Sequence, residues 1–317
     1  MTQNKDVLIC GSMAFDTIAV FEGRFRDHIL SDNLKSLSVS FFVPTLRKEF
    51  GGCAGNIAYN LKLLGGDPVP VGTVGQDAED YLQRLQDLGI DTRLVRVLPD
   101  TYTAQCYITT DLDNNQIASF HPGAMLRSAE NDLSGHSARW AIVSPDSKDG
   151  MFTHAERLRA AGIPFIFDLG QAMPLFDGDD LRRMLAMASI LTANDYEASV
   201  IEDRMGQPME AIAAGLTAAV VTRGAEGATL YERGTQTAIA PVPVTQLVDP
   251  TGCGDAHRGG LLYGLVNDWS LYDACCLANV MGGLKIASQG PQNHNPSRDQ
   301  IMAALHRHYG VTAGVLA

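Results

Sequence analysis

The residues best placed to do chemistry lie in one short segment of the chain, Asp249–Asp255, which reads Asp-Pro-Thr-Gly-Cys-Gly-Asp. A Gly-x-Gly turn that leads into a helix exposes several backbone N–H groups at the helix N-terminus, where they can bind a phosphate-like anion. Here such a turn comes just before an expected helix over residues 256–266. The amides of Gly252, Cys253 and Gly254 are therefore candidates for holding the γ-phosphoryl group of a nucleotide.

Asp255 is the unusual residue of this segment, because a site built only to hold an anion would not place a carboxylate beside it. The arrangement makes chemical sense if Asp255 accepts the proton of a hydroxyl group that attacks the bound phosphoryl group. The alternative is structural, since an aspartate at the start of a helix can cap its N-terminus. The segment alone leaves both interpretations open.

A second candidate segment follows the apolar run 219–221 and contains Thr222, Gly224 and Gly227. Ligands of open α/β sheets bind at the carboxyl ends of the strands, and glycine lets the backbone approach a ligand closely. Thr222 and the two glycines are thus candidates for contacting a nucleotide. The alternative is an ordinary hairpin turn into the next expected strand, over 228–231.

Asn194 and Glu197 form a third candidate pair, just after an expected strand over 190–192. Residues three apart share a face of a helix. A carboxylate beside an amide suits water-mediated binding of Mg²⁺, which takes few protein ligands and keeps several waters. We therefore expect Glu197 to hold Mg²⁺ through water and Asn194 to lie near the nucleotide. The alternative is an asparagine N-cap with a glutamate in the first helical turn.

A fourth set of candidates lies near the N-terminus, where Asp16 follows the first expected strand and Gly51, Gly52 and Asn56 surround the start of a helix. The apolar face of that helix excludes Asn56. Asp16 and Asn56 together supply a carboxylate and an amide for paired hydroxyl groups of a sugar. The alternative makes Gly51 and Gly52 a flexible hinge. Both roles are compatible, because closing a lid over a site of phosphoryl transfer excludes water.

The elements that must position these residues alternate between short apolar runs and amphipathic stretches, which is typical of an α/β protein with a mainly parallel central sheet. Several runs are apolar on both faces, as expected for strands covered by helices on both sides. Helices are expected over 54–64 and 78–88, the second with Asp77 as its N-cap and Gly89 after its end. The expected strands cover residues 7–10, 69–74, 140–144, 165–168, 190–192, 219–222 and 228–231.

Two segments, residues 17–49 and 101–120, interrupt this alternation. The second alternates apolar and polar residues and contains the turn-forming sequence Asp111–Asn115, which predicts a hairpin. We expect the two segments to form a small β-sheet that covers the mouth of a three-layer α/β/α domain as a lid. The α/β/α domain then consists of residues 1–16, 50–100 and 121–317.

The 317-residue chain has a globular composition, with 45% hydrophobic and 19% charged residues and a formal net charge of −12. Nucleic acids and anionic membranes require a basic surface, and no run of lysines or arginines provides one. The six cysteines form no Cys-x-x-Cys pair and no zinc-ligand pattern, as expected for reduced thiols. No apolar run approaches the roughly 20 residues of a membrane helix. These features predict a soluble, cytoplasmic protein that binds neither nucleic acid nor membrane.

Two common nucleotide-binding motifs are absent from the sequence: Gly-x-x-x-x-Gly-Lys-Ser/Thr, and Gly-x-Gly-x-x-Gly after the first strand. A P-loop NTPase or a dinucleotide-dependent oxidoreductase would therefore lack its anion-binding loop. A catalytically weak nucleotide-binding scaffold is a further alternative, and the presence of Asp255 argues against it.

Taken in order, the four candidate segments resemble the motifs of pfkB (ribokinase-family) carbohydrate kinases, and the resemblance covers nearly all of the chain. Four motifs in the right order are far more specific than any one of them. The matching positions are Gly51, Gly52 and Asn56 for Gly-Gly-x-x-x-Asn, Asn194 and Glu197 for Asn-x-x-Glu, Thr222, Gly224 and Gly227 for Thr-x-Gly-x-x-Gly, and Asp249, Thr251, Gly252, Gly254 and Asp255 for Asp-Thr-x-Gly-x-Gly-Asp, read flexibly around Pro250.

The resemblance implies a ribokinase-like fold, ATP and Mg²⁺ as cofactors, and a small-molecule acceptor. It also implies an adenine pocket that includes Asn279, and a lid that forms a dimer interface in several members. Many members bind a monovalent cation such as K⁺, expected here near Asp249, Thr251 and the loop 288–293.

The chain departs from the family pattern at Pro250, Cys253 and His257. Replacing the usual alanine by Cys253 changes little if its amide is the working group. His257 stands where an aromatic or aliphatic residue is usual. It either packs as an ordinary helix residue or alters a nucleotide or cation contact.

The segments 41–44, 120–125 and 290–294 resemble the bacterial adenosine-kinase-like branch of the family. Phe41 or Phe42 on the lid could stack on a purine base, while Asp16 and Asn56 hold the ribose hydroxyls. The alternative is that both phenylalanines form the core of the lid. The resemblance therefore suggests 5′-phosphorylation of adenosine to AMP, with ribose or another furanose as the alternative acceptor.

Overall fold

The computed structural model describes residues 5–29, 38–113 and 115–311, and within these ranges nine strands form a large sheet. Its strands are β1 (Asp6–Cys10), β4 (Asp67–Gly75), β5 (Val95–Leu98), β8 (Trp140–Val143), β9 (Phe165–Asp168), β10 (Ile190–Asn194), β11 (Ala218–Thr222), β12 (Ala228–Glu232) and β13 (Thr235–Ile239). Their order is β13-β12-β11-β10-β9-β8-β1-β4-β5. Only β12 pairs antiparallel, with β11 and β13, so the expected mainly parallel sheet is confirmed.

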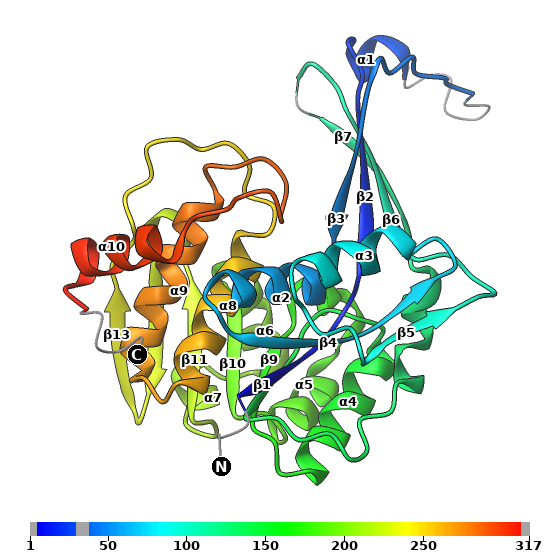
Figure 1. Ribbon diagram of the computed structural model, residues 1–317. Helices are drawn as coiled ribbons and strands as arrows, with labels where there is room; N and C mark the ends of the chain where they lie inside the picture. Colours follow the sequence, from blue (N-terminus) through cyan, green and yellow to red (C-terminus); the bar gives the residue numbers. More distant parts are fainter. Residues whose placement is uncertain (1–4, 30–37, 114, 312–317) are drawn as a thin grey trace.

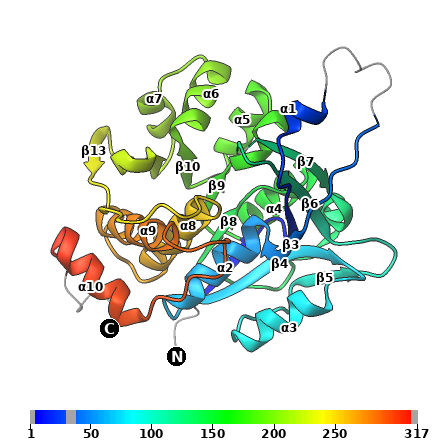
Figure 2. The ribbon, with the colours of Figure 1, turned by 90° about the horizontal axis from the view of Figure 1, so that it is seen from above.

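Helices cover both faces of this sheet (Figures 1 and 2). One face packs against α2 (Cys53–Leu63), α3 (Glu79–Asp87), α8 (Cys253–Val266), α9 (Leu271–Lys285) and α10 (Arg298–Tyr309). The other packs against α4 (Lys148–Ala160), α5 (Gly178–Leu185), α6 (Asp195–Met205) and α7 (Met209–Ala213). Among the described residues, three 3-10 segments, 123–130, 170–175 and 224–226, complete the connections. In the ranges described, no helix combines the length and apolarity needed to cross a bilayer.

The alternation of side chains along each strand divides the core into two halves. In β1, Val7 and Ile9 belong to the cluster on the α8 side, whereas Leu8 and Cys10 belong to the cluster on the α4 side. Successive side chains of a strand point to opposite faces, so a strand covered on both faces is apolar throughout. This explains the continuous apolar runs of the sequence and confirms the three-layer arrangement.

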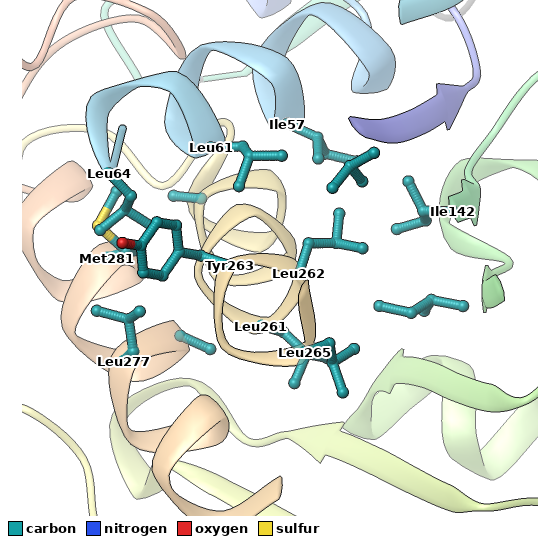
Figure 3. Packing of buried hydrophobic residues seen from close by; sticks show 14 of the residues in the cluster. Ile57, Leu61, Leu64, Ile142, Leu261, Leu262, Tyr263, Leu265, Leu277 and Met281 are labelled. Atoms are coloured by element: carbon teal, nitrogen blue, oxygen red, sulfur yellow. The ribbon is translucent and has the colours of Figure 1, made fainter. Parts of the chain in front are cut away.

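The half of the core on the α8 side of the sheet holds the helices α2, α8 and α9 together (Figure 3). These helices carry much of the candidate site. Ile57 and Leu61 of α2 meet Leu262 of α8 in a cluster that excludes water. Burying one such side chain contributes about 1.5–3 kcal/mol. At the contact of α8 with α9, a Cβ on Gly260 would lie 2.7 Å from the Cα of Ala278, so glycine lets the two helices approach closely. The N-termini of α2 and α8 are therefore held at fixed positions.

The second sheet projects away from the first (Figure 1). Its strands are β2 (Ala14–Val20), β3 (Thr45–Gly51), β6 (Ala104–Thr110) and β7 (Gln116–His121), in the order β3-β2-β6-β7, and the short helix α1 (Phe25–His28) lies at its tip. We call these strands and α1 the lid. The predicted hairpin is present, since β6 pairs antiparallel with β7. Residues 38–44, which belong to the expected lid segment, do not form a strand, since β3 begins only at Thr45. Within the expected lid segment, residues 30–37 lie outside the described residues.

Asp77 was predicted as the N-cap of α3, and that prediction is wrong. Ala78 occupies the cap position and the helix has no side-chain cap. The carboxylate of Asp77 instead accepts the backbone N–H of Thr103 at 2.7 Å and the side-chain amide of Gln105 at 2.8 Å. Asp77 thus connects the α/β body to the start of β6, at the base of the lid. Gly89 follows the end of α3 with a φ of 67°, as expected for a helix stop.

Candidate active site

A pocket of about 400 Å³ lies between β11, the start of α8 and the middle of α9. It brings together residues from four separate parts of the sequence. The lining residues include Thr222, Gly224, Gly227, Pro241, Val242, Val244, Leu247, Cys253, Gly254, His257, Asn279, Gly282, Gly283 and Ile286. The residues expected from the sequence to contact a nucleotide, except Asn194 and Gly252, therefore line one cavity. Its walls are largely apolar, which suits a flat aromatic base.

Asn279 and His257 give this pocket a small polar area. The side-chain amide of Asn279 donates to the carbonyl of Ala240 at 3.0 Å, which orients it at the pocket wall. His257 is only 4% exposed, and burial lowers its pKa to about 3, so the ring is neutral. The departure from the family pattern at His257 thus introduces a neutral ring that lines the nucleotide pocket.

The start of α8 has the turn geometry expected of an anion-binding site. Gly252 has a φ of 79°, and a Cβ there would lie 2.7 Å from the Cβ of Pro291, so only glycine fits. The amide of Cys253 donates to the carbonyl of Pro250 at 3.1 Å. One of the three expected phosphate donors is therefore already engaged, and the amide of Gly254 is the better candidate. Burial raises the pKa of the Cys253 thiol to about 11, so it stays uncharged.

Asp255 follows this turn and contacts Asn56 of α2. The side-chain amide of Asn56 donates to Oδ2 of Asp255 at 2.8 Å. Burial raises the pKa of Asp255 to about 6, and the negative charge of Asp168 adds to the shift, while the Asn56 bond opposes it. Asp255 is therefore ionised at neutral pH and close to the range in which a carboxylate can gain a proton. Asn56 was expected to bind sugar hydroxyls, but in this structure its amide donates to the candidate base.

The Asn56 side chain is fixed by a buried network behind it. Gln292 donates to the side-chain oxygen of Asn56 and to the hydroxyl of Tyr81, both at 3.0 Å. Tyr81 in turn donates to the carbonyl of Gly51 at 2.6 Å. The network connects α2, α3, β3 and the loop after α9, so it sets the direction in which Asn56 presents its amide to Asp255.

Asp16 lies on β2 at the base of the lid, directly opposite Glu49 of β3. A Cβ on Gly51 would lie 2.6 Å from Oδ2 of Asp16, so the absence of a side chain at Gly51 leaves room for this carboxylate. Burial raises the pKa of Asp16 to about 6, and the charges of Glu49 and Asp249 add to the shift. Gly52 has a φ of 82° where the chain turns into α2. Asp16 is thus a half-buried carboxylate near the site, available to accept hydrogen bonds from hydroxyl groups.

Asn194 and Glu197 form a reciprocal capping box at the start of α6. Asn194 Oδ1 accepts the backbone N–H of Glu197 at 2.7 Å, and Glu197 Oε2 accepts the backbone N–H of Asn194 at 2.8 Å. The side chain of Asn194 therefore caps the helix, as the structural alternative has it, and does not line the nucleotide pocket. Burial raises the pKa of Glu197, and the nearby charge of Asp168 adds to the effect.

Glu197 fits the expected magnesium only in the water-mediated form. In the described ranges, no group of three or more His, Cys, Asp and Glu side chains is arranged to hold a metal directly. Mg²⁺ needs few protein ligands when phosphate oxygens and water complete its shell. The capping bond uses Oε2 of Glu197, which leaves Oε1 as the atom to face such a hydrated ion.

The sequence did not reveal a buried ion pair beside the site. Arg258 of α8 donates to both carboxylate oxygens of Asp168, at 2.9 and 3.1 Å, and both side chains are at most 6% exposed. Asp168 ends β9, and its charge raises the pKa of both Asp255 and Glu197. An acidic residue that ends an apolar strand was the available signal, because ligand sites gather at the carboxyl ends of the strands.

Asp249 and Thr251 lie before the glycine turn and were expected to hold a monovalent cation. The Asp249 carboxylate accepts the backbone N–H of Thr251 at 2.9 Å and that of Gly290 at 2.8 Å. Burial raises the pKa of Asp249, but these bonds outweigh it and hold the pKa below the usual value. The carbonyl of Asp249 accepts a bond from Lys285 at 2.7 Å. This lysine, isolated in an apolar helix, was missed at the level of sequence.

The two lid phenylalanines have different environments. Phe41 packs against Phe21 and Phe25, with ring centroids 4.9 and 5.0 Å apart, so it belongs to the core of the lid. For Phe41, the structure therefore agrees with the alternative that the ring is part of the core of the lid. Phe42 is 84% exposed and packs against none of these rings. Of the pair, it is the one free to meet a ligand.

Comparison with known proteins agrees with the family resemblance of the motifs. A family model described as pfkB family carbohydrate kinase matches residues 6–298. The nucleoside kinase of Burkholderia thailandensis in complex with inosine is 51% identical, with a TM-score of 0.87 over 96% of this chain and 99% of that chain. Its complex with ADP and inosine is 52% identical, with a TM-score of 0.85 over 96% and 97% of the two chains. The nucleoside kinase of Methanocaldococcus jannaschii is 26% identical over 86% of this chain and 90% of its own length.

Proposed function

The chain belongs to the pfkB family of carbohydrate kinases, and we propose that it transfers the γ-phosphoryl group of ATP to the 5′-hydroxyl of a purine ribonucleoside. The observation that carries the proposal is the Asp255–Asn56 pair at the start of α8, beside the apolar pocket. A base, a helix N-terminus and a nucleotide pocket then lie in one place. Adenosine is the first acceptor to test.

In the proposed reaction the acceptor hydroxyl gives its proton to Asp255. The hydroxyl oxygen forms a bond to the γ-phosphorus, the bond from that phosphorus to the β,γ-bridging oxygen breaks, and ADP leaves. With a pKa of about 6, Asp255 is charged at neutral pH yet basic enough to take the proton as the hydroxyl attacks. The bond from Asn56 orients the carboxylate and keeps it ionised.

The start of α8 would hold the transferred group. First-turn amides of a helix have no partner within the helix and carry the positive end of its dipole, so the amide of Gly254 suits the γ-phosphoryl oxygens. Glu197 would hold Mg²⁺ through water, and the ion would neutralise charge on the β- and γ-phosphates. Thr222, Gly224, Gly227 and Asn279 would contact the rest of the nucleotide.

The acceptor would lie between the α8 turn and the base of the lid. Asp16 supplies a half-buried carboxylate there for the ribose hydroxyls, and closure of the lid would exclude water from the reaction. Phe42 is an exposed ring that could cover a base after closure. Purine nucleosides other than adenosine enter the proposal because the similar Burkholderia thailandensis enzyme binds inosine.

An ADP-coupled assay tests the proposal directly. Adenosine, inosine, guanosine, cytidine, ribose and fructose would be compared at the same ATP and Mg²⁺ concentrations. We expect kcat/KM for adenosine or inosine to exceed that for ribose about 10-fold or more, as one base-stacking contact of roughly 1–3 kcal/mol would give. Equal values for ribose and the nucleosides would favour the sugar-kinase alternative instead.

We also propose that the lid forms a dimer interface. Large apolar side chains lie exposed on the lid, at 65% for Leu46, 48% for Tyr107 and 55% for Phe120. Edge strands with exposed apolar residues pair readily with a second sheet. Light scattering with size-exclusion chromatography would show a dimer, and charged residues in place of Leu46 and Tyr107 would give a monomer.

A further inference from the structure

Lys285, at the end of α9, is the observation from which the inference starts. Its side chain is fully buried. Its Nζ donates to the carbonyl of Asp249 at 2.7 Å and to the carbonyl of Ser288 at 3.1 Å. Buried ammonium groups are rare because desolvation is costly, and they persist where hydrogen bonds compensate.

The two carbonyls belong to loops that are far apart in sequence. The Asp249 loop leads into the glycine turn of α8, and the Ser288 loop continues to Pro291, which packs against Gly252. A second connection joins the same loops, because the backbone N–H of Gly290 donates to the Asp249 carboxylate at 2.8 Å. Lys285 therefore holds the position of the turn on which the proposed phosphate cradle depends.

The monovalent cation implied by the family resemblance was expected near Asp249, Thr251 and the loop 288–293, which is where these two carbonyl oxygens lie. Such ions bind carbonyl oxygens that converge on one point. Here the carbonyls of Asp249 and Ser288 converge on an ammonium group that the chain itself supplies. A second cation at hydrogen-bond distance from them would be repelled by Lys285. The residues of this chain therefore do not fit an additional monovalent ion at this place.

We propose that the ammonium of Lys285 takes the place of the monovalent cation, so that the kinase needs no K⁺ to order its phosphate-binding turn. An ammonium ion and K⁺ have similar size and both bind carbonyl oxygens, which makes the exchange chemically reasonable. Lys285 acts through the turn and touches neither reactant, so it is a positioning residue. The proposal does not depend on which hydroxyl compound is the acceptor.

The first test compares monovalent salts. Activity would be measured in KCl, NaCl and tetramethylammonium chloride at equal ionic strength, which keeps screening of exposed charges constant. We expect wild-type rates in the three salts to agree within about twofold, since no exchangeable ion takes part. Loss of most activity in tetramethylammonium chloride, with recovery in KCl, would overturn the proposal.

The second test removes the ammonium. Lys285→Ala leaves a space, and we expect activity to fall about 10- to 100-fold, as loss of charged hydrogen bonds would give, with recovery in KCl or NH₄Cl but not in tetramethylammonium chloride. Lys285→Met fills the space with an apolar chain, so its loss should not be reversed by K⁺. Lys62→Ala removes a lysine elsewhere on the surface of the body and serves as the control.

Two further measurements need no turnover, so they do not depend on the choice of acceptor or on the activity of the variants. Thermal unfolding of Lys285→Ala should move to higher temperature in KCl, whereas that of the wild type and Lys285→Met should not. Calorimetry should show ADP binding to Lys285→Ala strengthened by K⁺. If the folded variant responds to K⁺ in none of the three measurements, Lys285 has only a packing role and the proposal is wrong. An inactive acceptor panel would leave these two results unaffected.

Discussion

The α/β body and the lid both contain a β-sheet, but the two sheets differ in how their faces are covered. The central strands of the body are buried on both faces, as in β9, where all four residues are buried. In the lid, all six residues of β7 are exposed. The body therefore has a continuous core on each side of its sheet, whereas the lid depends on strand pairing, on the base contacts of Asp77 and on a small aromatic cluster at its tip.

This difference matches the parts that each region plays in the proposed reaction. Phosphoryl transfer depends on positioning and electrostatics, which require rigid supports. Asp255, the glycine turn and the nucleotide pocket all belong to the body. Because the lid buries few apolar side chains, a change in its position should cost little free energy. Four predictions test this division between a fixed body and a movable lid.

The largest effect is expected at the candidate base. Asp255→Asn keeps the shape of the side chain but removes its ability to take a proton, so kcat should fall about 10²- to 10⁴-fold. ADP binding, measured by calorimetry, should be nearly unchanged, because the pocket is intact. Asp299→Asn, at an exposed first-turn aspartate of α10, is the matched control. If Asp255→Asn turns over at close to the wild-type rate, Asp255 has only a structural role at the start of α8 and is not the base.

The second prediction contrasts the two cores. Phe167 of β9 is fully buried, and Phe167→Ala should lower the free energy of unfolding by about 3–5 kcal/mol. Phe41→Ala should leave unfolding of the body unchanged and increase hydrogen exchange in the lid alone. Urea denaturation and mass-spectrometric hydrogen exchange would measure both. A global loss of stability in Phe41→Ala would mean that lid and body unfold as one unit.

The third prediction concerns the pH dependence of the base. Asp255 acts as a carboxylate with a pKa of about 6, so kcat/KM should fall as the pH drops below that value. Asn56→Ala removes a hydrogen bond that favours the charged form, so the pKa should rise and the fall should begin at higher pH, by up to about one unit. Asn267→Ala, remote from the site, should keep the wild-type profile. A shift to lower pH would contradict the assigned role of Asn56.

The smallest effect is expected at Phe42. Because this ring is 84% exposed, Phe42→Ala should change the free energy of unfolding by less than about 0.5 kcal/mol. If the ring covers the base after lid closure, KM for adenosine should rise several-fold, as loss of roughly 1 kcal/mol of stacking would give, while KM for ribose stays the same. Equal changes in both KM values would remove Phe42 from base recognition.

Local patterns in the sequence were enough to predict much of the fold. The apolar runs predicted the strands because strands covered on both faces are apolar throughout, and Gly89 stops α3 as expected. The hairpin at Asp111 is also present, with the carboxylate of Asp111 accepting the amides of Asp113 and Asn115. Each of these features depends on residues within a few positions of one another.

The sequence by itself determined the α/β class, the order of the four motifs and the turn that precedes Asp255. The tertiary structure alone decided the partners: Asn56 reaches Asp255 across 199 positions, and Arg258 reaches Asp168 across 90. Lys285 shows the reason most clearly, because its partners are backbone carbonyls, which every residue has and no spacing can mark. Helix periods and turn residues act over a few positions, whereas a buried charge is satisfied by whatever the packing of distant elements brings to it.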